Sequence, residues 1–341
     1  MRKHYASSTD VARLAGVSQS TVSRTFRGDT RVSPEARSKV MEAAQELDYR
    51  PNLLPRIMLT QQSRLVALVI GGMHNPFYAR VLERFTIRLQ EMKCQVMLAH
   101  VDSDDALDSV VPRLSGYRVD AVVSALSVLT EAAANQLIEL RVPVISFNTH
   151  MRKKGLYTIS CDNQQAGREA ARHLISQGGR RLAYLGGPEH NPANIDRRRG
   201  FAEEARARGF EPVLSNDEFS FAGGARQAAR IFASATPPDA VFCGNDLIAI
   251  GAVDALWRSS EITPPQPLRM VGFDDIPQTA WAPYELSSIL QDEEAMIDRA
   301  LSILDDLYAD VDMPDRVELL VPGKMITRRS SLNGLQLPGR N

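Results

Sequence analysis

Two hydrophobic patterns divide this chain. Up to about residue 50, apolar residues recur at helical spacing in three short segments. From residue 65 onward, continuous apolar runs alternate with segments of helical periodicity. Such runs are typical of strands buried on both faces, and their alternation with helices predicts parallel sheets covered by helices. The pattern therefore predicts a small all-α domain followed by a larger α/β region.

The small domain begins with two helical segments separated by a glycine. Residues 10–15 keep apolar side chains at helical spacing until Gly16 interrupts them. Ser18 is a suitable N-cap for a second helix, in which Val22 and Phe26 recur at helical spacing. Two short helices joined by a tight turn predict a helix-turn-helix, whose second helix enters the major groove of DNA. The alternative is a helical hairpin inside a larger α domain.

A third helix completes this domain. Ser33 is suited to its N-cap, Pro34 to its first position and Glu35 to its first turn. We expect the apolar stripe of this helix to pack on the first two helices, with Val40, Ala43, Ala44 and Leu47 against Val11, Leu14 and Val22. Residues 1–50 are therefore predicted to form a three-helix headpiece.

The segment 51–64 joins the headpiece to the rest of the chain and is apolar, although linkers are normally polar. One interpretation is a strand or helix docked on the larger region. The other is a short hinge helix that packs on its dimer mate and on DNA. Because proline is tolerated only in the first turn of a helix, Pro55 predicts that a hinge helix begins near Leu53 or Leu54.

Residues 65–341 contain two successive sets of strand and helix patterns. Strands are predicted at 65–70, 96–99, 121–124 and 142–147 in the first set, and at 182–185, 240–243 and 270–273 in the second. Helices are predicted after the first strand to about residue 91 and at 104–115, 130–140, 163–177, 194–208, 222–234 and 246–258. The two sets predict two similar α/β subdomains built on parallel sheets. Ligands of such folds bind at the carboxyl ends of strands and in clefts between domains.

The charge of the chain is unevenly distributed. Residues 1–64 carry 11 Lys and Arg against 6 Asp and Glu, a net charge of +5. The remainder carries 29 Lys and Arg against 35 Asp and Glu, a net charge of −6. A basic head on an acidic body indicates that only the headpiece meets a polyanion. Hydrophobic residues at 44% and charged residues at 24% are ordinary for a soluble globular protein.

Several features favour a cytoplasmic protein that has no membrane partner. Cys94, Cys161 and Cys243 are odd in number, far apart and without CxxC spacing, so we expect buried free thiols. The first residues contain no apolar stretch of the kind found in a signal peptide. No run approaches the ~20 apolar residues of a transmembrane helix.

Motifs of common catalytic chemistry are absent from the sequence. It contains no P-loop, GxGxxG, GxSxG or HExxH motif, and its six His residues are scattered. We therefore expect no enzyme activity, no catalytic residues, no metal site and no cofactor.

Several short motifs follow one another along the chain: Asp10-Val11-Ala12, Ala15-Gly16-Val17-Ser18, Thr21-Val22-Ser23-Arg24, Tyr49-x-Pro51-Asn52, Asn75-Pro76-Phe77-Tyr78, Asp162-Asn163, Arg197-x-x-Gly200-Phe201, Gly244-Asn245-Asp246 and Val271-Gly272-Phe273-Asp274-Asp275. In order and spacing they resemble the LacI/GalR family of bacterial transcriptional regulators, from about Ser7 to Arg329. The resemblance implies a helix-turn-helix headpiece at 1–50, a hinge at 51–64 and a periplasmic-binding-protein-like core of two doubly wound parallel-sheet subdomains at 65–341. The N-subdomain would comprise about 65–160 plus 292–320, and the C-subdomain about 161–291 plus 321–330.

The resemblance also implies which residues contact DNA. Positions at which the family reads bases are held here by Gln19, Ser20 and Arg24. Positions at which it holds phosphates, contacts that position a protein but do not specify sequence, are held by Ser18, Thr21, Ser23 and Asn52. Met58 takes the place of the apolar hinge residue, usually Leu, that wedges into the minor groove. The alternative for Met58 is packing within the linker, and Pro55 departs from the family's usual Ala.

The effector of the family lies in the cleft between the core subdomains. The matching positions here are the loop 74–78, with His74, Phe77 and Tyr78, and further Asn148, Asp162, Asn191, Arg197, Phe219, Asp246, Asp274 and Gln291. Aromatic rings can stack on a ring face, while Arg197 and Asp274 can make charge-assisted hydrogen bonds. The alternatives are a surface salt bridge for Arg197, helix N-capping for Asp162 and Asp246, and an ordinary loop position for His74.

The resulting hypothesis is a repressor that responds to a small-molecule effector. It would bind a pseudopalindromic double-stranded DNA operator as a homodimer, because two-fold symmetry presents two recognition helices. One alternative is a solute-binding protein, which would need a signal peptide and no headpiece. Another is a sugar-modifying enzyme with an accessory DNA-binding head. Residues 330–341 lack a leucine heptad, which argues against a tetramer through a C-terminal coiled coil.

Overall fold

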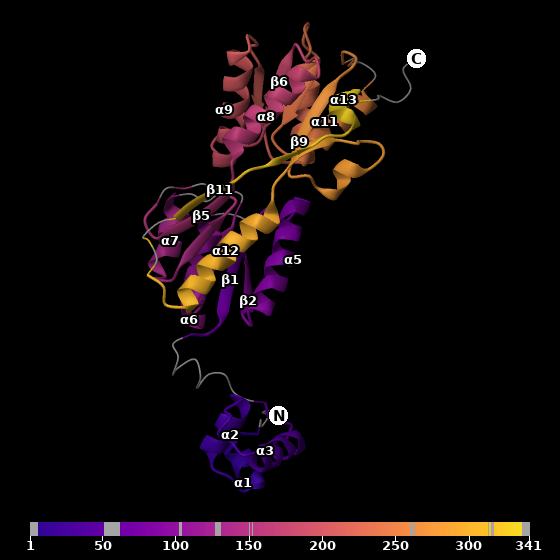
Figure 1. The fold of residues 1–341 in the computed structure, drawn as a ribbon. Coiled ribbons are helices and arrows are strands. Elements are labelled where there is room, and N and C mark those ends of the chain that lie inside the picture. Colours follow the sequence, from indigo (N-terminus) through magenta and orange to yellow (C-terminus); the bar gives the residue numbers. More distant parts are fainter. Residues whose placement is uncertain are drawn as a thin grey trace. The chain divides into compact units, whose positions relative to one another are not determined.

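The computed structural model describes residues 6–50, 62–101, 104–126, 131–149, 151, 153–259, 262, 264–312, 314 and 317–335. They belong to two compact units, Met1–Ser63 and Arg64–Asn341 (Figure 1). Most of the predicted hinge, with Asn52, Pro55 and Met58, lies outside the described residues. Within the described part of the chain, no helix is both long enough and apolar enough to cross a membrane.

Three helices form the headpiece: α1 (Ser8–Ala15), α2 (Gln19–Phe26) and α3 (Pro34–Glu46). Ser7 and Asp10 form a capping box at the start of α1, and Gly16 ends this helix with a φ of +64°. Ser18 caps α2 with its side chain, and α3 begins with the predicted serine cap and proline. These local signals act within one turn of the chain, and the helix-turn-helix predicted for 10–26 is confirmed.

The headpiece core is small, and one predicted member lies outside it. Its buried apolar residues come from all three helices: Val11, Ala12, Val22, Val40, Ala43 and Ala44. Leu14, which we expected to pack there, is 47% exposed. At 3.6 residues per turn, the inner stripe of α1 runs through Val11, Ala12 and Ala15, and Leu14 falls about 60° beyond Val11 on the solvent side.

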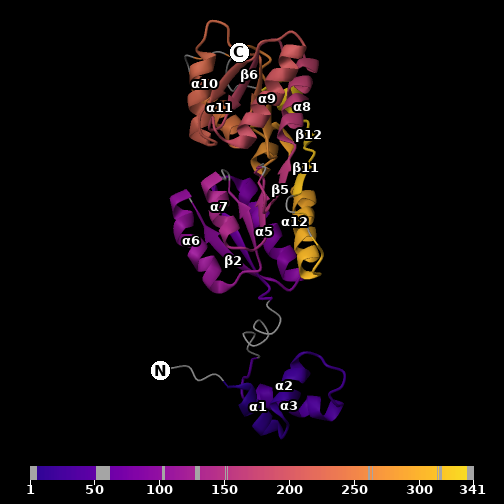
Figure 2. The same cartoon turned by 90° about the vertical axis from the view of Figure 1, so that its left-hand side faces the viewer.

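The larger unit contains two six-stranded sheets. The first has the strand order β11-β5-β4-β3-β1-β2, and every neighbouring pair is parallel. Its strands are β1 (Leu65–Ile70), β2 (Gln95–His100), β3 (Ala121–Ala125), β4 (Val144–Phe147), β5 (Leu156–Cys161) and β11 (Val317–Val321). One face is covered by α5 (Pro76–Glu91) and α12 (Glu293–Tyr308), the other by α6 (Asp104–Tyr117) and α7 (Glu131–Glu139) (Figure 2).

Strand β1 shows why its sequence is a continuous apolar run. Val66, Leu68 and Ile70 are buried in the cluster that contains α5 and α12. The intervening Ala67 and Val69 are buried in the cluster that contains α6 and α7. Because both faces of this parallel sheet are covered by helices, neither face of the strand can be polar.

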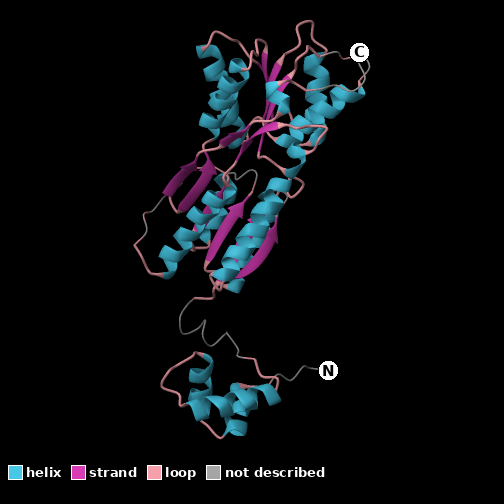
Figure 3. Ribbon diagram, turned by 45° about the vertical axis from the view of Figure 1, so that its right-hand side comes forward, coloured by secondary structure: helices cyan, strands magenta, loops and turns pink. Residues whose placement is uncertain are grey.

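The second sheet has the order β12-β10-β9-β8-β6-β7, with β12 antiparallel to β10 and the other pairs parallel. Its strands are β6 (Leu182–Gly186), β7 (Val213–Asn216), β8 (Ala240–Cys243), β9 (Arg269–Phe273), β10 (Ser287–Leu290) and β12 (Lys324–Ile326). Helices α8 (Asn163–Ser176) and α9 (Pro192–Ala207) lie on one face, and α10 (Phe221–Phe232) and α11 (Asp246–Arg258) on the other (Figure 2). Figure 3 shows strands flanked by helices in each subdomain. The short helices η1 (Pro277–Ala280) and α13 (Arg329–Leu332) complete this subdomain. The predicted fold class, a helical headpiece with two α/β subdomains, is confirmed.

Eight of the described elements were not predicted from the hydrophobic pattern: β5, β7, β10, β11, β12, α12 and the short helices η1 and α13. Strands β7, β11 and β12 lie at sheet edges, where half-exposed residues interrupt an apolar run. The chain crosses between the subdomains after β5, after β10 and after β11. All three cysteines are buried and free, as predicted.

Helix α12 follows a strand of the second sheet but packs on the first, where ion pairs hold it against α5. Arginines one turn apart on α5 face acids on α12: Arg80 lies 3.5 Å from Glu293, Arg84 pairs with both Glu293 and Glu294, and Arg88 lies 2.7 Å from Asp298. The crossover after β10 is therefore fixed along the side of the first subdomain.

Two glycines set the distance between α8 and α9. A Cβ atom at Gly167 would lie 2.3 Å from the carbonyl oxygen of Arg197, and one at Gly200 would lie 1.9 Å from that of Gln164. Glycine is therefore required at both positions for the backbones to come this close. The close packing also seats Arg197, which α9 carries, against the neighbouring helix.

We expect Gly200→Ala to destabilise the larger unit, because the added methyl group would overlap the carbonyl of Gln164. Overpacking of this kind costs about 1–3 kcal/mol or more in the free energy of unfolding. Urea denaturation followed by circular dichroism measures the effect. The matched control is Gly116→Ala on α6, where the new Cβ would have nothing within 4 Å. The control should be neutral or stabilise by up to about 1 kcal/mol. Equal midpoints for Gly200→Ala and the wild type would contradict the packing argument.

Candidate functional site

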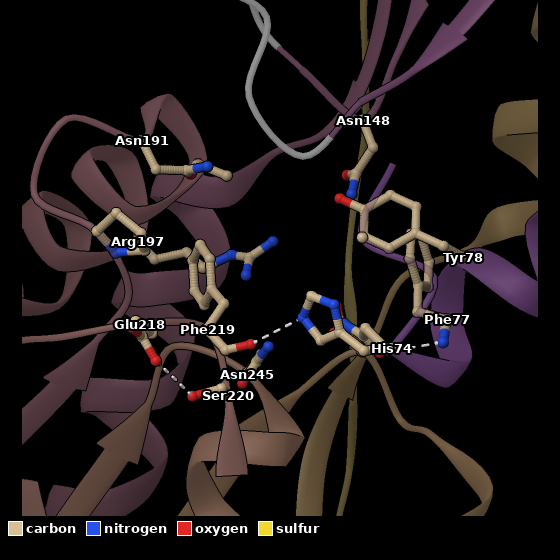
Figure 4. Close-up of a pocket in the computed structure, with 15 residues that line it drawn as sticks. His74, Phe77, Tyr78, Asn148, Asn191, Arg197, Glu218, Phe219, Ser220 and Asn245 are labelled. Carbon is tan, nitrogen blue, oxygen red and sulfur yellow. Dashed lines mark hydrogen bonds between the residues drawn. The ribbon is translucent and has the colours of Figure 1, made fainter. Parts of the chain in front are cut away.

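A cavity of about 300 Å³ lies between the two subdomains of the larger unit, next to the carboxyl ends of strands from both sheets. Its walls are formed by Gly72, His74, Asn75, Phe77, Tyr78, Asn148, Pro188, Asn191, Ala193, Arg197, Glu218, Phe219, Ser220, Asn245 and Asp274. Figure 4 shows His74, Phe77, Tyr78 and Asn148 on one side, facing Asn191, Arg197, Phe219 and Asn245 on the other. This is the place where ligands of open α/β sheets bind.

Arg197 is held rigidly in the wall contributed by α9. Its Nε donates to Oδ1 of Asn163 at 2.8 Å, and one terminal nitrogen donates to the carbonyl of Gly244 at 2.6 Å. The guanidinium also lies 3.4 Å from the centre of the Phe273 ring. In Figure 4 the end of the side chain extends toward the opposite wall. The surface salt bridge considered for Arg197 is wrong, since this side chain is buried.

Asp274 links the two walls. It follows β9 with a φ of +106°, and its side chain is buried. Asn75, the N-cap of α5, donates to Oδ2 at 2.8 Å, and Gln291 donates to Oδ1 at 2.7 Å. Burial raises the pKa of the Asp274 carboxyl, while the positive charge of Arg197 and the two amide hydrogen bonds oppose this shift. The bond from Asn75 therefore joins the first subdomain to a buried group of the second.

Arg80 holds the backbone beside this carboxylate. Its terminal nitrogens donate to the carbonyl of Asp275 at 3.0 Å and to that of Asp274 at 3.2 Å. The same arginine lies beside Glu293, whose pKa is raised by burial. One side chain of the first subdomain thus contacts both the loop after β9 and the first turn of α12.

The aromatic wall depends on two glycines. A Cβ atom at Gly187 would lie 2.5 Å from the Phe219 ring, and one at Gly244 would lie 3.3 Å from it. The ring can therefore rest on bare backbone. Opposite it, burial raises the pKa of Tyr78 to about 12, so its hydroxyl stays protonated near neutral pH. His74 lies with Nε2 3.4 Å from the carbonyl oxygen of Phe219 (Figure 4).

The structure brings eight of the eleven predicted effector residues to the cavity: His74, Phe77, Tyr78, Asn148, Asn191, Arg197, Phe219 and Asp274. The other three are not among its lining residues. Asp162 caps α8 by accepting from the backbone N–H of Gln165, the N-capping alternative already considered. Gln291 lies behind Asp274 and orients that carboxylate.

Asp246 is the third, and it is fully buried at the start of α11. Its Oδ2 accepts from the backbone N–H of Ile276 at 2.9 Å, and Oδ1 accepts from the Ser288 hydroxyl at 2.7 Å. The helix cap is its neighbour Asn245, so the N-capping alternative for Asp246 is wrong. Burial raises the pKa of Asp246 well above its ordinary value, and the nearby Asp274 raises it further. These hydrogen bonds tie the start of α11 to β10 and to the loop after β9.

Seven lining residues were not named individually among the predicted effector residues, although the family motifs include Asn75 and Asn245: Gly72, Asn75, Pro188, Ala193, Glu218, Ser220 and Asn245. Asn75 and Asn245 cap helices that follow β1 and β8, and a polar residue between a strand and a helix marks the carboxyl edge of a sheet. That signal could have identified both. Ser220 carries the same signal, because it caps α10, the helix that follows β7, and Glu218 lies in the same loop two residues before it.

The predicted DNA-contacting residues of the headpiece gather at one helix. Ser18 caps α2, and Gln19, Ser20, Thr21, Ser23 and Arg24 lie on it. The side chains of Gln19, Ser20, Ser23 and Arg24 are exposed. The Ser18 hydroxyl lies 2.8 Å from that of Ser20 and 2.9 Å from that of Thr21. Among the described residues, no group of three or more His, Cys, Asp or Glu is arranged to hold a metal ion.

Asp246→Asn tests the buried carboxyl. The amide can accept from Ile276 and donate to Ser288, which keeps both bonds while removing the charge. A carboxyl whose pKa is raised by folding binds more protons in the folded state, so its contribution to stability falls as pH rises above about 4. The wild type should lose stability relative to the variant by up to about 1.4 kcal/mol per pH unit until the folded pKa is passed.

Urea midpoints from pH 4.5 to 7.5 measure this loss of stability. The exposed Asp312→Asn is the control. Parallel curves of urea midpoint against pH for Asp246→Asn and the wild type would contradict a raised pKa of Asp246 in the folded protein.

Comparisons with known proteins agree with both parts of the chain. The model of "Bacterial regulatory proteins, lacI family" matches residues 9–52, and that of "Periplasmic binding protein-like domain" matches residues 171–331. The HTH-type transcriptional regulator CelR of Thermobifida fusca is 30% identical over 320 residues, which cover 91% of this chain and 94% of that protein.

Two solved structures have the same architecture. A transcriptional regulator CelR–cellobiose complex aligns with a TM-score of 0.71 at 29% identity, over 95% of this chain and 99% of that one. The lac repressor dimer bound to operator and the anti-inducer ONPF aligns with a TM-score of 0.85 at 22% identity, over 96% and 100%, which shows the shared fold. The chain belongs to the lacI family and is a DNA-binding transcriptional regulator with a periplasmic-binding-protein-like core.

Proposed function

We propose that this regulator is a repressor whose affinity for its operator is controlled by a small polar effector, a sugar or related metabolite, bound in the cavity of the core. The observation that carries the proposal is the cavity itself, where a rigid Arg197 and a buried Asp274 lie among amides and aromatic rings from both subdomains. We propose the same division of the chain as before, into a headpiece at 1–50, a hinge at 51–64 and a two-part core.

The chemistry of the walls supports a polyhydroxylated ligand. Hydroxyl groups both donate and accept, which suits the mixed set of Asn75, Asn148, Asn191 and Asn245 amides. The buried charges of Arg197 and Asp274 can add charge-assisted bonds. Phe219 offers an apolar face on which a sugar ring can stack. The CelR protein was solved with cellobiose, so cellobiose is the first compound to test.

Binding in this cavity can change DNA affinity only if the effector favours one arrangement of the two subdomains. The walls come from both subdomains, so a ligand that bridges them contributes energy to the closed arrangement alone. Coupling is reciprocal, so operator DNA must change effector affinity by the same factor. A homodimer would present two copies of α2 to a pseudopalindrome. Repression is the simplest consequence, because a protein bound to DNA excludes other proteins from its site.

The lining residues are suited to binding rather than to catalysis, and we propose that the protein is not an enzyme. Both oxygens of Asp274 accept hydrogen bonds from amides, and the Ser220 hydroxyl donates to Glu218. No Ser or Cys hydrogen-bonded to a His lines the cavity in the described part of the chain. The contacts of Asn52 and Met58 with DNA stay predictions.

Arg24→Ala should weaken operator binding by about 1–3 kcal/mol per half-site and relax sequence preference. Arg24 is exposed on α2 one turn after the residues at its start, where an arginine can reach base edges. Binding titrations and selection from random oligonucleotides measure both effects. Arg13→Ala on α1 is the matched control, because it also removes an exposed positive charge from the headpiece. An unchanged sequence preference in Arg24→Ala would remove this residue from base readout.

Arg197→Ala should retain operator binding and lose the response to the effector. A thermal-shift screen that starts with cellobiose and includes sugar acids and nucleobases identifies the compound, since a ligand of the folded state raises its stability. We expect that compound to shift the wild-type operator midpoint by about 5- to 150-fold, and the shift to vanish in the variant.

The control is Arg199→Ala, an exposed arginine two residues along the same helix. Arg197 also bonds to Asn163 and Gly244, so thermal midpoints show whether each variant is folded at the assay temperature. A folded Arg197→Ala protein that responds with the wild-type midpoint would remove Arg197 from the effector site.

A further inference from the structure

The side chain of Gln19 is tied to a different helix from its own. Gln19 is the first residue of α2, and Ser8 is the first residue of α1. The Nε2 atom of Gln19 donates to the Oγ atom of Ser8 at 2.8 Å, although the two residues are eleven positions apart. The bond fixes the direction of an exposed side chain that stands where α2 meets the major groove in a helix-turn-helix.

The hydroxyl of Ser8 is left for this bond because its neighbour caps the helix. The Ser7 Oγ atom accepts from the backbone N–H of Asp10 at 3.2 Å. The Asp10 carboxylate in turn accepts from the backbone N–H and the hydroxyl of Ser7 at 3.0 and 2.6 Å. This reciprocal box satisfies the start of α1 without Ser8. The side chain of Ser8 therefore acts on Gln19 rather than on its own helix.

The bond also determines which hydrogen-bonding groups of the Gln19 amide remain available to a base. A glutamine amide carries two N–H donors and one carbonyl acceptor. Ser8 takes one donor, which leaves one N–H and the carbonyl oxygen of the same amide for a base. In the major groove, adenine presents the acceptor N7 beside the donor N6, whereas guanine presents two acceptors, N7 and O6. The remaining groups of Gln19 match adenine, while at guanine the carbonyl oxygen would face another acceptor.

We propose that Gln19 reads an adenine at one base pair of each half-site and that Ser8 is the positioning residue that makes this reading selective. The inference rests on the proposed base readout by α2 and names the base and the residue that orients the reader. Without Ser8, the amide is free to turn both N–H groups toward a guanine. The bond to Ser8 also orders the Gln19 side chain in the protein without DNA, so less conformational entropy is lost on binding.

The experiment uses the full-length protein and duplexes that differ at single base pairs. Gln19→Ala first identifies the base pair whose preference depends on Gln19. Titrations on duplexes with A·T or G·C at that pair then give the preference of each variant. We expect Ser8→Ala to lower the preference for adenine over guanine by about 2- to 12-fold, the effect of losing one hydrogen bond.

Two control variants separate positioning from a general structural role. Ser8→Thr keeps the hydroxyl and should keep the preference. Thr9→Ala changes the next, exposed residue of α1 and should leave the preference unchanged. In the Gln19→Ala background, Ser8→Ala should have no further effect on that base pair. The salt dependence of binding should be the same for all variants, because phosphate contacts are untouched.

Three results would overturn the inference and leave the proposed base readout by α2 intact. The first is a preference for guanine or a pyrimidine at the pair that depends on Gln19. The second is a Ser8→Ala protein that keeps the wild-type preference. The third is an equal loss of affinity for both duplexes together with a lower thermal midpoint, which would mean that Ser8 serves only the fold. If Gln19→Ala leaves the preference at every base pair intact, readout by Gln19 is itself wrong, and the inference fails together with that part of the proposed function.

Discussion

The buried carboxylate of Asp274 is the constraint on which the arrangement of the core depends. An ionised group removed from water must be compensated by hydrogen bonds and opposite charge. Here Asn75 and Gln291 supply one bond to each oxygen, and Arg197 supplies the charge nearby. Asn75 belongs to the first subdomain and Asp274 to the second, so separating the two subdomains would leave the carboxylate without one of its donors. The free energy of burying this carboxylate therefore depends on how the two subdomains meet at the cavity.

The same carboxylate lies beside the elements that connect the subdomains. Gln291 immediately precedes the capping residue of α12, and Arg80 contacts both the loop after β9 and the start of that helix. Ion pairs then continue along α12 and α5. Surface ion pairs contribute little individually, but this series orients a whole helix across the first sheet. Contacts at the cavity are thus connected to a rigid element that extends across the first subdomain.

The headpiece is built on a different principle. Its core holds six buried apolar residues, three of them alanines. Because so small a core contributes little burial, the capping interactions at the helix ends are important for its stability. Ser7 defines where α1 begins, Gly16 where it ends and Ser18 where α2 begins. Because the caps consume those side chains, the polar residues of the first turns, Ser8 and Gln19, remain available to each other. A capping pattern thereby determines which groups are presented on the surface.

Local sequence determined the elements whose causes act within a few residues. The caps of the headpiece helices, the continuous apolar strand 65–70 and the residue types of the cavity follow from the chain alone, because capping and periodicity involve near neighbours. Residues 245 and 246 show a difference that local sequence does not determine. Both are polar and adjacent, yet Asn245 lines the cavity while Asp246 is turned away to bond Ile276 and Ser288. Likewise, Asn75 meets Asp274 across 199 positions of sequence. Only the tertiary structure decided these pairings, because they depend on how two sheets and their crossovers pack, and no local pattern encodes which distant atoms are brought into contact.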